Sequence, residues 1–285
     1  MLVSDAAKPV YSPLVSNVQT SSGSRGKDNM QTIAAFMLVL CHLGISQALN
    51  CTEAPRLSYA TQVDAGLGQV VARNRYNWGY LLMRSSWYSL PYIRIRHVSV
   101  GHAGIWAVDT SFRVYQLQGG SWQRAPGFLK QVDAGGNVFA VGVSSQSNAS
   151  CLSTGSILFS GRTDGWTQVR SGLTYYSCGL YGCWGVGTRG QVYVTENVTP
   201  SNCTMSGWTH VPGLSLKMVE VGSDGRVFGV TLSGEVYERT GIDSARRQGL
   251  RWTQHPMCMS MVHVSYDLGR LWVVSTSGLM MQCTI

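Results

Sequence analysis

The stretch WTHVPGLSLKMVEVGSDGRVFGV, residues 208–230, contains a Trp, a Pro-Gly pair, alternating apolar residues, a glycine turn and then Phe-Gly-Val. Apolar alternation with a period of two is typical of half-buried antiparallel strands. The chain contains no segment with the 3.6-residue apolar stripe of an amphipathic helix. The stretch therefore predicts strands joined by tight turns, and the same order of residues occurs elsewhere in the chain.

The Trp that opens the stretch recurs at intervals of 35, 44, 42 and 44 residues, and a Pro or Arg follows each Trp four positions later. Next comes an alternating segment, then an aromatic-small-Val signature, then often a Val-Tyr pair. The alternating segment occurs six times, as ATQVDAG, RHVSVG, KQVDAG, YYSCG, KMVEVG and VHVSYD. Four short strands in about 35 to 45 residues are the signature of one blade of a β-propeller.

The sequence therefore predicts an all-β fold, a six-bladed β-propeller. The first copy, near Tyr59, has no Trp strand before it, and the last copy stops after GLMMQC at 278–283. The sixth blade is thus one strand short, and residues 51–58 are placed to supply it. We expect a ring closed by N- and C-terminal strands in one blade, which removes most exposed strand edges.

Two sets of aromatic residues recur with the unit. We interpret the first set chiefly as packing between blades, with sugar stacking as the less favoured role, and we place the second set in the core between sheets. The first set is Trp87, Trp122, Trp166, Trp208 and Trp252, and the second is Trp106, Phe139, Trp184, Phe228 and Trp272.

An apolar run at 31–45 follows Arg25 and Lys27 and precedes a small-x-small cleavage pattern. About 15 apolar residues are short against the roughly 20 that a membrane-spanning helix needs, so the run predicts a secretory signal peptide at 30–48. Residues 1–29 are then a leader or upstream extension, expected to be disordered, and 49–285 form the propeller. We expect a secreted, extracellular protein without membrane insertion.

Residues 49–285 keep 19 basic and 12 acidic residues. Nucleic-acid binders usually concentrate positive charge on one face or element, whereas these basic residues are scattered through the repeats. The charge pattern therefore does not predict a nucleic-acid partner, and attraction to acidic glycans remains open.

Seven cysteines follow the predicted signal peptide, an odd number for an oxidising compartment. Terminal strands in one blade would bring the first and last of them together, and a four-residue hairpin loop would do the same for the third and fourth. A remaining pair leaves Cys258 without a partner, so that an oligomer could form through it. No paired CxxC motif indicates zinc. The expected disulfides are Cys51–Cys283, Cys178–Cys183 and Cys151–Cys203.

Four Asn-x-Ser/Thr sequons occur, at Asn50, Asn148, Asn197 and Asn202. Asn148 lies in a polar stretch that we read as a loop, which favours modification there. We predict glycosylation at Asn148, Asn197 and Asn202.

Several segments resemble fish-egg lectins of the tectonin group: LKQVDAGG (129–136), YYSCGLYGCWGV (175–186), VEVGSDGRVFGV and HVSYDLGRLWVVS. The resemblance extends from about Leu49 to the end of the chain. It implies a secreted six-bladed propeller that binds N-acetylglucosamine-type or related sugars on microbial surfaces. The family pattern pairs eight cysteines, and Ser275 occupies the position of the eighth here, which fits an unpaired Cys258.

No motif for catalysis competes with this interpretation. The chain has no GxSxG, HExxH or P-loop sequence. Paired carboxylates could serve glycoside hydrolysis, but Asp64, Asp133 and Glu220 fall at equivalent positions of the repeat, where a turn or strand-edge role is expected. We therefore predict no enzymatic activity.

Sugar binding needs hydrogen-bonding side chains beside an apolar platform, and such residues are expected in the turns, where the repeats diverge. The predicted function is a carbohydrate-binding lectin of innate defence whose partners are microbial or egg-surface glycans; the alternative is an extracellular protein–protein interaction propeller. No cofactor is predicted, and calcium in the Asp-rich turns is left open because no contiguous calcium loop occurs. The candidate sugar-binding residues are His102, Asn137, Tyr181, Asp224, Arg226, Asp267 and Arg270.

Overall fold

A computed structural model of the chain describes residues 49–136, 139–153, 165–195, 198–199, 203–205 and 207–285. Contacts divide the chain into two units, Met1–Gly44 and Ile45–Ile285, and all described residues belong to the second. The predicted leader and signal peptide therefore lie outside the described residues. The described part is built from antiparallel strands, and none of its residues belongs to a helix that could span a membrane.

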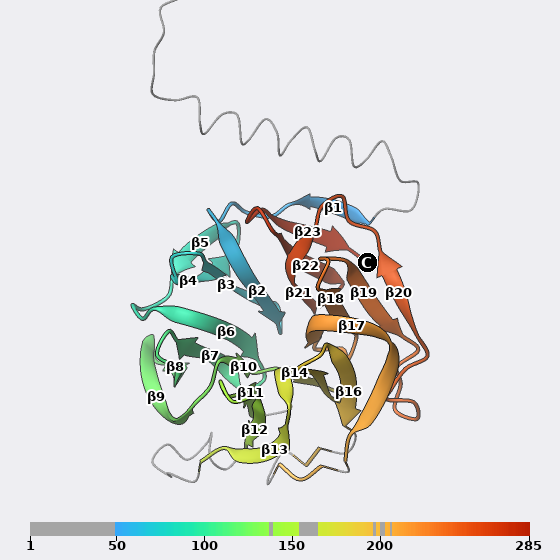
Figure 1. Cartoon of the computed structure of the whole chain (residues 1–285). Helices are drawn as coiled ribbons and strands as arrows, with labels where there is room; N and C mark the ends of the chain where they lie inside the picture. The colour runs from blue at the N-terminus through green and yellow to red at the C-terminus, as the bar shows by residue number, and fades with distance from the viewer. Residues whose placement is uncertain (1–48, 137–138, 154–164, 196–197, 200–202, 206) are drawn as a thin grey trace, which may run out of the picture. The chain divides into compact units, whose positions relative to one another are not determined.

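Strands of the second unit form sheets arranged around a central axis, as Figure 1 shows. Three of the four-stranded sheets use consecutive strands joined by tight turns. The first contains β2 (Ala60–Gly66), β3 (Gln69–Asn74), β4 (Gly79–Met83) and β5 (Ser86–Ser89). The next contains β6 (Ile95–Gly101), β7 (Gly104–Asp109), β8 (Arg113–Gln118) and β9 (Ser121–Phe128). The third contains β10 (Gln131–Asp133), β11 (Ala140–Val143), β12 (Asn148–Leu152) and β13 (Thr167–Ser171).

A seven-stranded sheet follows, and its middle strand includes part of the Trp208 repeat. Its strands are β14 (Leu173–Gly179), β15 (Gly182–Gly187), β16 (Gln191–Thr195), β17 (Thr209–Val221), β18 (Val227–Thr231), β19 (Val236–Thr240) and β20 (Arg251–His255). The first part of β17 pairs with β16 and the last part pairs with β18. The sequence predicted two separate strands here, whereas the structure has one strand of 13 residues. Gly213, at a φ of +107°, lets the chain change direction without leaving the sheet, since glycine adopts positive φ at little cost.

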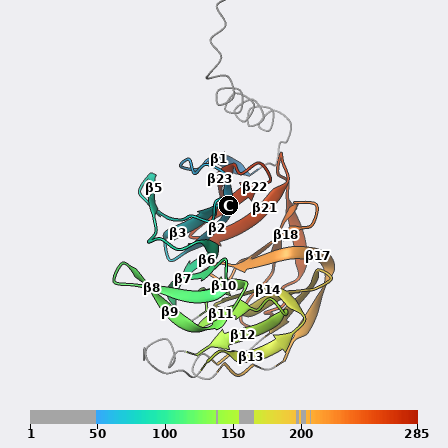
Figure 2. The same cartoon turned by 60° about the vertical axis from the view of Figure 1, so that its left-hand side comes forward.

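The last sheet joins the two ends of the described chain. It contains β1 (Asn50–Glu53), β23 (Met280–Thr284), β22 (Arg270–Ser275) and β21 (Met261–Asp267). β1 lies beside β23 in both views of the molecule (Figure 2), with Cys51 opposite Cys283. The prediction that terminal strands share one sheet is confirmed.

The first strand of each sequence repeat lies closest to the axis of the ring. These inner strands are β2, β6, β10, β14, the C-terminal part of β17, and β21, and each contacts the next in that cyclic order, with β21 returning to β2. The sequence predicted six separate four-stranded blades. The structure instead divides into four sheets of four strands and one of seven, because β17 joins two sets. The fold is an all-β propeller.

The aromatic residues of the second repeated set are all buried, with at most 4% of each side chain exposed. Trp106 packs against Val132 of the next inner strand and against Ala134, which follows that strand, and Phe228 stacks on Tyr266 of β21. Their predicted place in the core is confirmed.

The structure pairs the cysteines as the sequence analysis expected, at Cys51–Cys283, Cys151–Cys203 and Cys178–Cys183. The expectation of an unpaired Cys258 is wrong, because this cysteine is disulfide-bonded. An oxidised sulfur offers no thiol, so the predicted route to an oligomer through Cys258 loses its basis. Ser275 is buried and forms a hydrogen bond with Ser277.

Candidate functional site

Acidic and hydroxyl side chains alternate around the inner strands. Each occupies the same position of the repeat and is buried. In chain order they are Asp64, Ser99, Asp133, Ser177, Glu220 and Ser265. The sequence placed the three acids at turns or strand edges, and this prediction is wrong. The carboxyls instead accept hydrogen bonds from neighbouring inner strands and connect the sheets.

Asp64 shows how the connection is made. Its Oδ2 accepts a hydrogen bond from the backbone N–H of Val100 on one side, at 2.7 Å, and its Oδ1 accepts one from Ser265 on the other, at 3.0 Å. Two residues earlier on the same strand, Gln62 bonds to both the N–H and the carbonyl of Val98. Because equivalent residues face each other, β2 and β6 run in the same direction. All turns that follow inner strands are therefore expected at one end of the ring.

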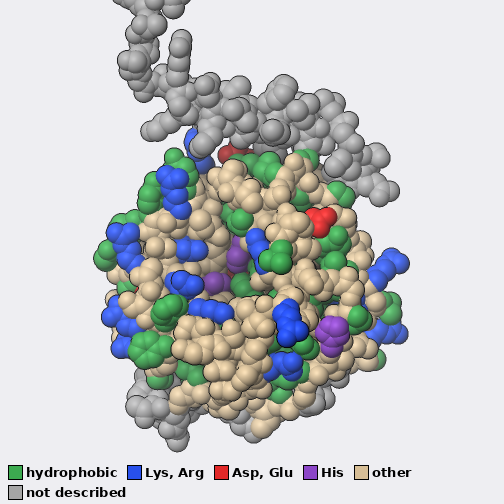
Figure 3. Space-filling model, in the orientation of Figure 1, with side chains coloured by type: hydrophobic (Ala, Val, Ile, Leu, Met, Phe, Trp, Pro, Cys, Tyr) green, Lys and Arg blue, Asp and Glu red, His purple; other side chains and the backbone are tan. Residues whose placement is uncertain are grey.

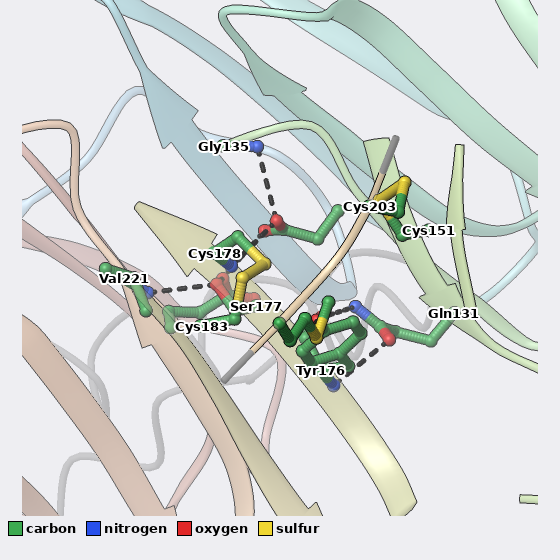
Figure 4. Close-up of a disulfide and its surroundings, with 12 residues drawn as sticks. Gln131, Gly135, Cys151, Tyr176, Ser177, Cys178, Cys183, Cys203 and Val221 are labelled. Atoms are coloured by element: carbon green, nitrogen blue, oxygen red, sulfur yellow. Dashed lines mark hydrogen bonds between the residues drawn. A yellow bond between two sulfur atoms is a disulfide. The ribbon is translucent and has the colours of Figure 1, made fainter. Parts of the chain in front are cut away.

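The same arrangement surrounds the Cys178–Cys183 disulfide (Figure 4). Asp133 accepts a hydrogen bond from the N–H of Cys178 at 3.0 Å, and Ser177 lies within 3.1 Å of Asp133 and 3.0 Å of Glu220. The Ser177 hydroxyl has one proton for two carboxyls, so the site is best satisfied when one carboxyl is protonated.

Burial of the carboxyls raises their pKa and so favours the protonated form that the shared Ser177 proton requires. It raises the pKa of Asp64 from 3.8 to about 6, and burial followed by the nearby Asp64 carboxylate raises the pKa of Asp133. The pKa of Glu220 is raised well above its ordinary value, first by burial and then by Asp64 and Asp133. Within the described ranges, no three His, Cys, Asp or Glu side chains gather to hold a metal ion.

Three of the predicted sugar-binding residues lie together at the turn end of the ring. The aromatic ring of Tyr181, half-buried in the β14–β15 turn, lies directly over Gly225 in the β17–β18 turn. A Cβ added to Gly225 would approach the Tyr181 ring to 2.5 Å. Asp224 is exposed beside it and uses one carboxylate oxygen to accept the N–H of Arg226. The Tyr181 hydroxyl has no hydrogen-bond partner among the described residues, so it is available to a ligand.

Arg226 anchors this turn to the next sheet. Its guanidinium binds the Glu238 carboxylate at 2.8 Å and the Tyr266 hydroxyl at 3.0 Å, and it lies 4.7 Å from the centre of the Tyr266 ring. All three guanidinium nitrogens therefore have a partner, and the side chain remains 30% exposed. Arg226 can position the turn and still offer a donor at its surface.

Asp267 has a different position from the one predicted. It is 4% exposed, accepts the N–H of Gly68 at 2.6 Å, and accepts a hydrogen bond from the Ser223 hydroxyl. Both of its oxygens are occupied, so it joins three turns and is not placed to contact a sugar. The remaining candidates are apart from the Tyr181 group: His102 is exposed on its own turn, and Arg270 bonds to Gln282.

Asn137, Asn197 and Asn202 lie outside the described residues. Asn148, predicted to lie in a loop, is instead the half-buried first residue of β12. It directly follows a turn at Ser147, where φ is +64°. Its glycosylation stays a prediction.

The repeated Trp residues lie between neighbouring sheets, as predicted, and each is partly buried. The sequence did not reveal the role of the proline four residues after the Trp. Its carbonyl accepts a hydrogen bond from the indole N–H of the Trp in the following sheet. The two such bonds are Trp122–Pro91 at 2.8 Å and Trp166–Pro126 at 2.8 Å, and Trp87 bonds in the same way to Pro55 at 2.7 Å.

Comparisons with known structures agree with the propeller fold. A gluconolactonase from Xanthomonas campestris superposes with a TM-score of 0.60 at 8% identity, covering 82% of this chain and 89% of that chain. The Cps50 (Swd1) β-propeller domain of Myceliophteria thermophila superposes with a TM-score of 0.54 at 9% identity, covering 83% and 99%. At these identities the likeness shows the fold alone.

Sequence comparisons identify the family. A fish-egg lectin of Cyprinus carpio is 38% identical over 158 residues, which is 54% of this chain and 66% of the carp protein. The match thus spans just under two thirds of the carp lectin. Residues 59–276, which contain all the inner strands, match the tectonin domain. The chain therefore belongs to the tectonin family.

Proposed function

We propose that this protein is a secreted lectin that binds N-acetylglucosamine-type or related sugars on microbial surfaces, serves innate defence and catalyses no reaction. Membership of the tectonin family and the similarity to a carp fish-egg lectin support carbohydrate binding. Three disulfides in the described residues support an oxidising, extracellular location.

We also propose that the ring has six blades. The division of β17 supports this count, since its first part completes the sheet of β14–β16 and its last part begins the sheet of β18–β20. Treating the two parts as separate strands gives six sets of four. Each set then contributes one inner strand to the cyclic order described above.

The observation that carries the sugar-binding proposal is the group formed by Tyr181, Asp224 and Arg226. A sugar ring presents C–H groups on its faces and hydroxyls at its edge. The Tyr181 ring offers an apolar face. Within the part of the chain that the structure describes, its hydroxyl has no partner and one Asp224 carboxylate oxygen is free for a sugar hydroxyl. These groups come from two neighbouring turns, so a sugar would lie between two blades.

A titration of N-acetylglucosamine into the full chain, followed by calorimetry, tests the site. We expect Tyr181→Ala to weaken binding at least tenfold, a loss of about 1.4 kcal/mol, which is in the range of one aromatic contact. Leu268→Ala is the matched control, because Leu268 is an exposed residue of an equivalent turn and is not a candidate sugar-binding residue. Retention of full affinity by Tyr181→Ala would move the site elsewhere, and a glycan array with no retention by folded protein would refute the lectin assignment.

A further inference from the structure

Positively charged side chains gather at the end of the ring where the inner strands begin. This end is opposite the turns that follow the inner strands. Arg96, Lys130 and Lys217 each stand immediately before a residue that faces the axis: His97, Gln131 and Met218. Figure 3 shows a hollow at the centre of one face, with histidine side chains inside it and Lys and Arg side chains around it. We call the hollow between these strand beginnings the vestibule.

Arg73 contributes a fourth cation from β3. Its backbone pairs with Gln62 of the adjacent inner strand, and the Gln62 side chain contacts the His97 ring at 3.2 Å. Lys217 reaches across to the carbonyl of Met261, the first residue of the next inner strand, at 3.3 Å. The four cations therefore come from four different inner-strand regions and surround the same axis.

The floor of the vestibule is a triangle of three side chains. The ring centres of His97, Tyr175 and His263 are 5.7 to 6.2 Å apart. The Tyr175 hydroxyl donates to Glu220 at 2.5 Å and lies 3.2 and 3.1 Å from Nε2 of the two histidines. Because the Tyr175 hydroxyl donates its proton to Glu220, its oxygen is left to accept hydrogen bonds from Nε2–H of both histidines.

This arrangement leaves polar atoms without partners. Nε of Arg73 is buried without a hydrogen-bond partner among the described residues. The same holds for Nδ1 of His263, which is 7% exposed. None of Arg73, Arg96, Lys130 and Lys217 forms a salt bridge with a carboxylate of the described residues. Unsatisfied buried polar atoms are costly, and a bound anion would supply an acceptor for the N–H of Arg73 Nε.

Charge at neutral pH favours an anion. Burial, followed by the neighbouring Arg96, lowers the pKa of Arg73 to about 10, so its guanidinium stays protonated. Burial, followed by Arg73 and Lys217, lowers the pKa of His263 to about 3, so that imidazole is neutral. The vestibule thus holds four unpaired positive charges above a neutral floor.

We propose that the vestibule binds a phosphate monoester, held by Arg73, Arg96, Lys130 and Lys217 above the ring of His263. A dianion compensates more of the four charges than a carboxylate would. The several oxygens of a phosphate also suit cations that approach from different sides. This site is distinct from the turn-end sugar site, because the inner strands separate the two. A glycan could therefore be recognised by its phosphate at one end of the ring and by its sugar at the other.

The test is a calorimetric titration of inorganic phosphate into the full chain at low ionic strength. We expect saturable binding, weakened at least tenfold in the double variant Lys130→Gln/Lys217→Gln. Arg270→Gln removes one positive charge at the opposite end and should bind phosphate as the parent protein does. Absence of saturable binding, unchanged affinity in the double variant, or an equal loss in Arg270→Gln would overturn the proposal.

A second measurement covers the case in which the double variant fails to fold. In NMR spectra of the unaltered protein, phosphate should shift the ring signals of His263, and unphosphorylated glucosamine should leave them in place; the reverse would refute the site. Tighter binding of glucosamine 6-phosphate than of inorganic phosphate would identify a phosphorylated sugar as the source, whereas equal affinities would indicate recognition of the phosphate group alone. Tyr181→Ala should keep phosphate affinity, which separates a failure of this proposal from a failure of the sugar site.

Discussion

Replacing Asp64 with Asn should change how the stability of the propeller depends on pH. Burial raises the pKa of Asp64 from 3.8 to about 6, so the folded state binds the proton more tightly than the unfolded chain does. The contribution of this carboxyl to stability is therefore fully present below pH 3.8 and is lost as the pH rises through about 6. A shift of about two pH units, at 1.36 kcal/mol each, amounts to about 3 kcal/mol.

Asp64→Asn removes this titration and keeps the shape of the side chain. The amide oxygen can still accept the N–H of Val100, and the amide nitrogen can donate to Ser265. Urea unfolding of both proteins from pH 4 to pH 7 measures the effect. The loss of the Asp64 charge also lowers the pKa of Asp133 and Glu220, which changes stability in the same direction. Relative to the parent, the variant should gain about 2 to 3 kcal/mol of stability over that range.

The control is Gln131→Leu, which removes a buried inner-strand side chain that does not titrate. Gln131 bonds to the backbone of Tyr176 on the next strand, so its loss should lower stability without a comparable dependence on pH. The inference about Asp64 is refuted if the difference in unfolding free energy between Asp64→Asn and the parent protein is constant with pH or has the opposite sign.

Two further predictions concern the connections between sheets. Replacing Cys51 and Cys283 with Ala opens a loop with a sequence separation of 232 residues and should lower the free energy of unfolding by about 5 kcal/mol by chain entropy. This loss should exceed the loss from opening the short Cys178–Cys183 disulfide between β14 and β15, and urea midpoints of the two variants compare them. An equal or smaller loss for the Cys51–Cys283 variant would count against ring closure as the source of the stability. Trp122→Phe should lower stability by about 1 kcal/mol because the Pro91 carbonyl loses its donor. Trp252→Phe should lower stability less, since the Trp252 indole N–H has no partner among the described residues. Thermal unfolding measures both variants, and equal losses would show that the hydrogen bond contributes nothing.

Much of the local structure could be predicted from the sequence, because strand pairing within a sheet joins segments that follow each other through short turns. The alternation in 214–222 and the turn at GSDGR predicted the hairpin of β17 and β18, and the terminal copies predicted that β1 pairs with β23. The repeated Trp and Phe positions predicted which aromatics are buried, since hydrophobic residues at equivalent positions of a repeat face equivalent interfaces.

Contacts across the ring could not be predicted in this way. Asp64 and Ser265 are separated by 201 residues and meet only because the ring closes, and the same closure occupies both oxygens of Asp267, which the sequence offered as a ligand contact. No local sequence pattern distinguishes an acidic residue that bridges inner strands from one that lies in a turn. The difference depends on which groups of other strands lie beside the carboxyl in the folded protein.

The sequence by itself thus determined the repeat, its strands and the turns in which a sugar site was expected. Only the tertiary structure decided that Tyr181 lies over Gly225 beside Asp224, and that Arg73 lies near His97 and His263. The physical reason is that hairpins form from neighbouring residues, whereas these groups combine side chains from different sheets that only packing around a common axis brings together.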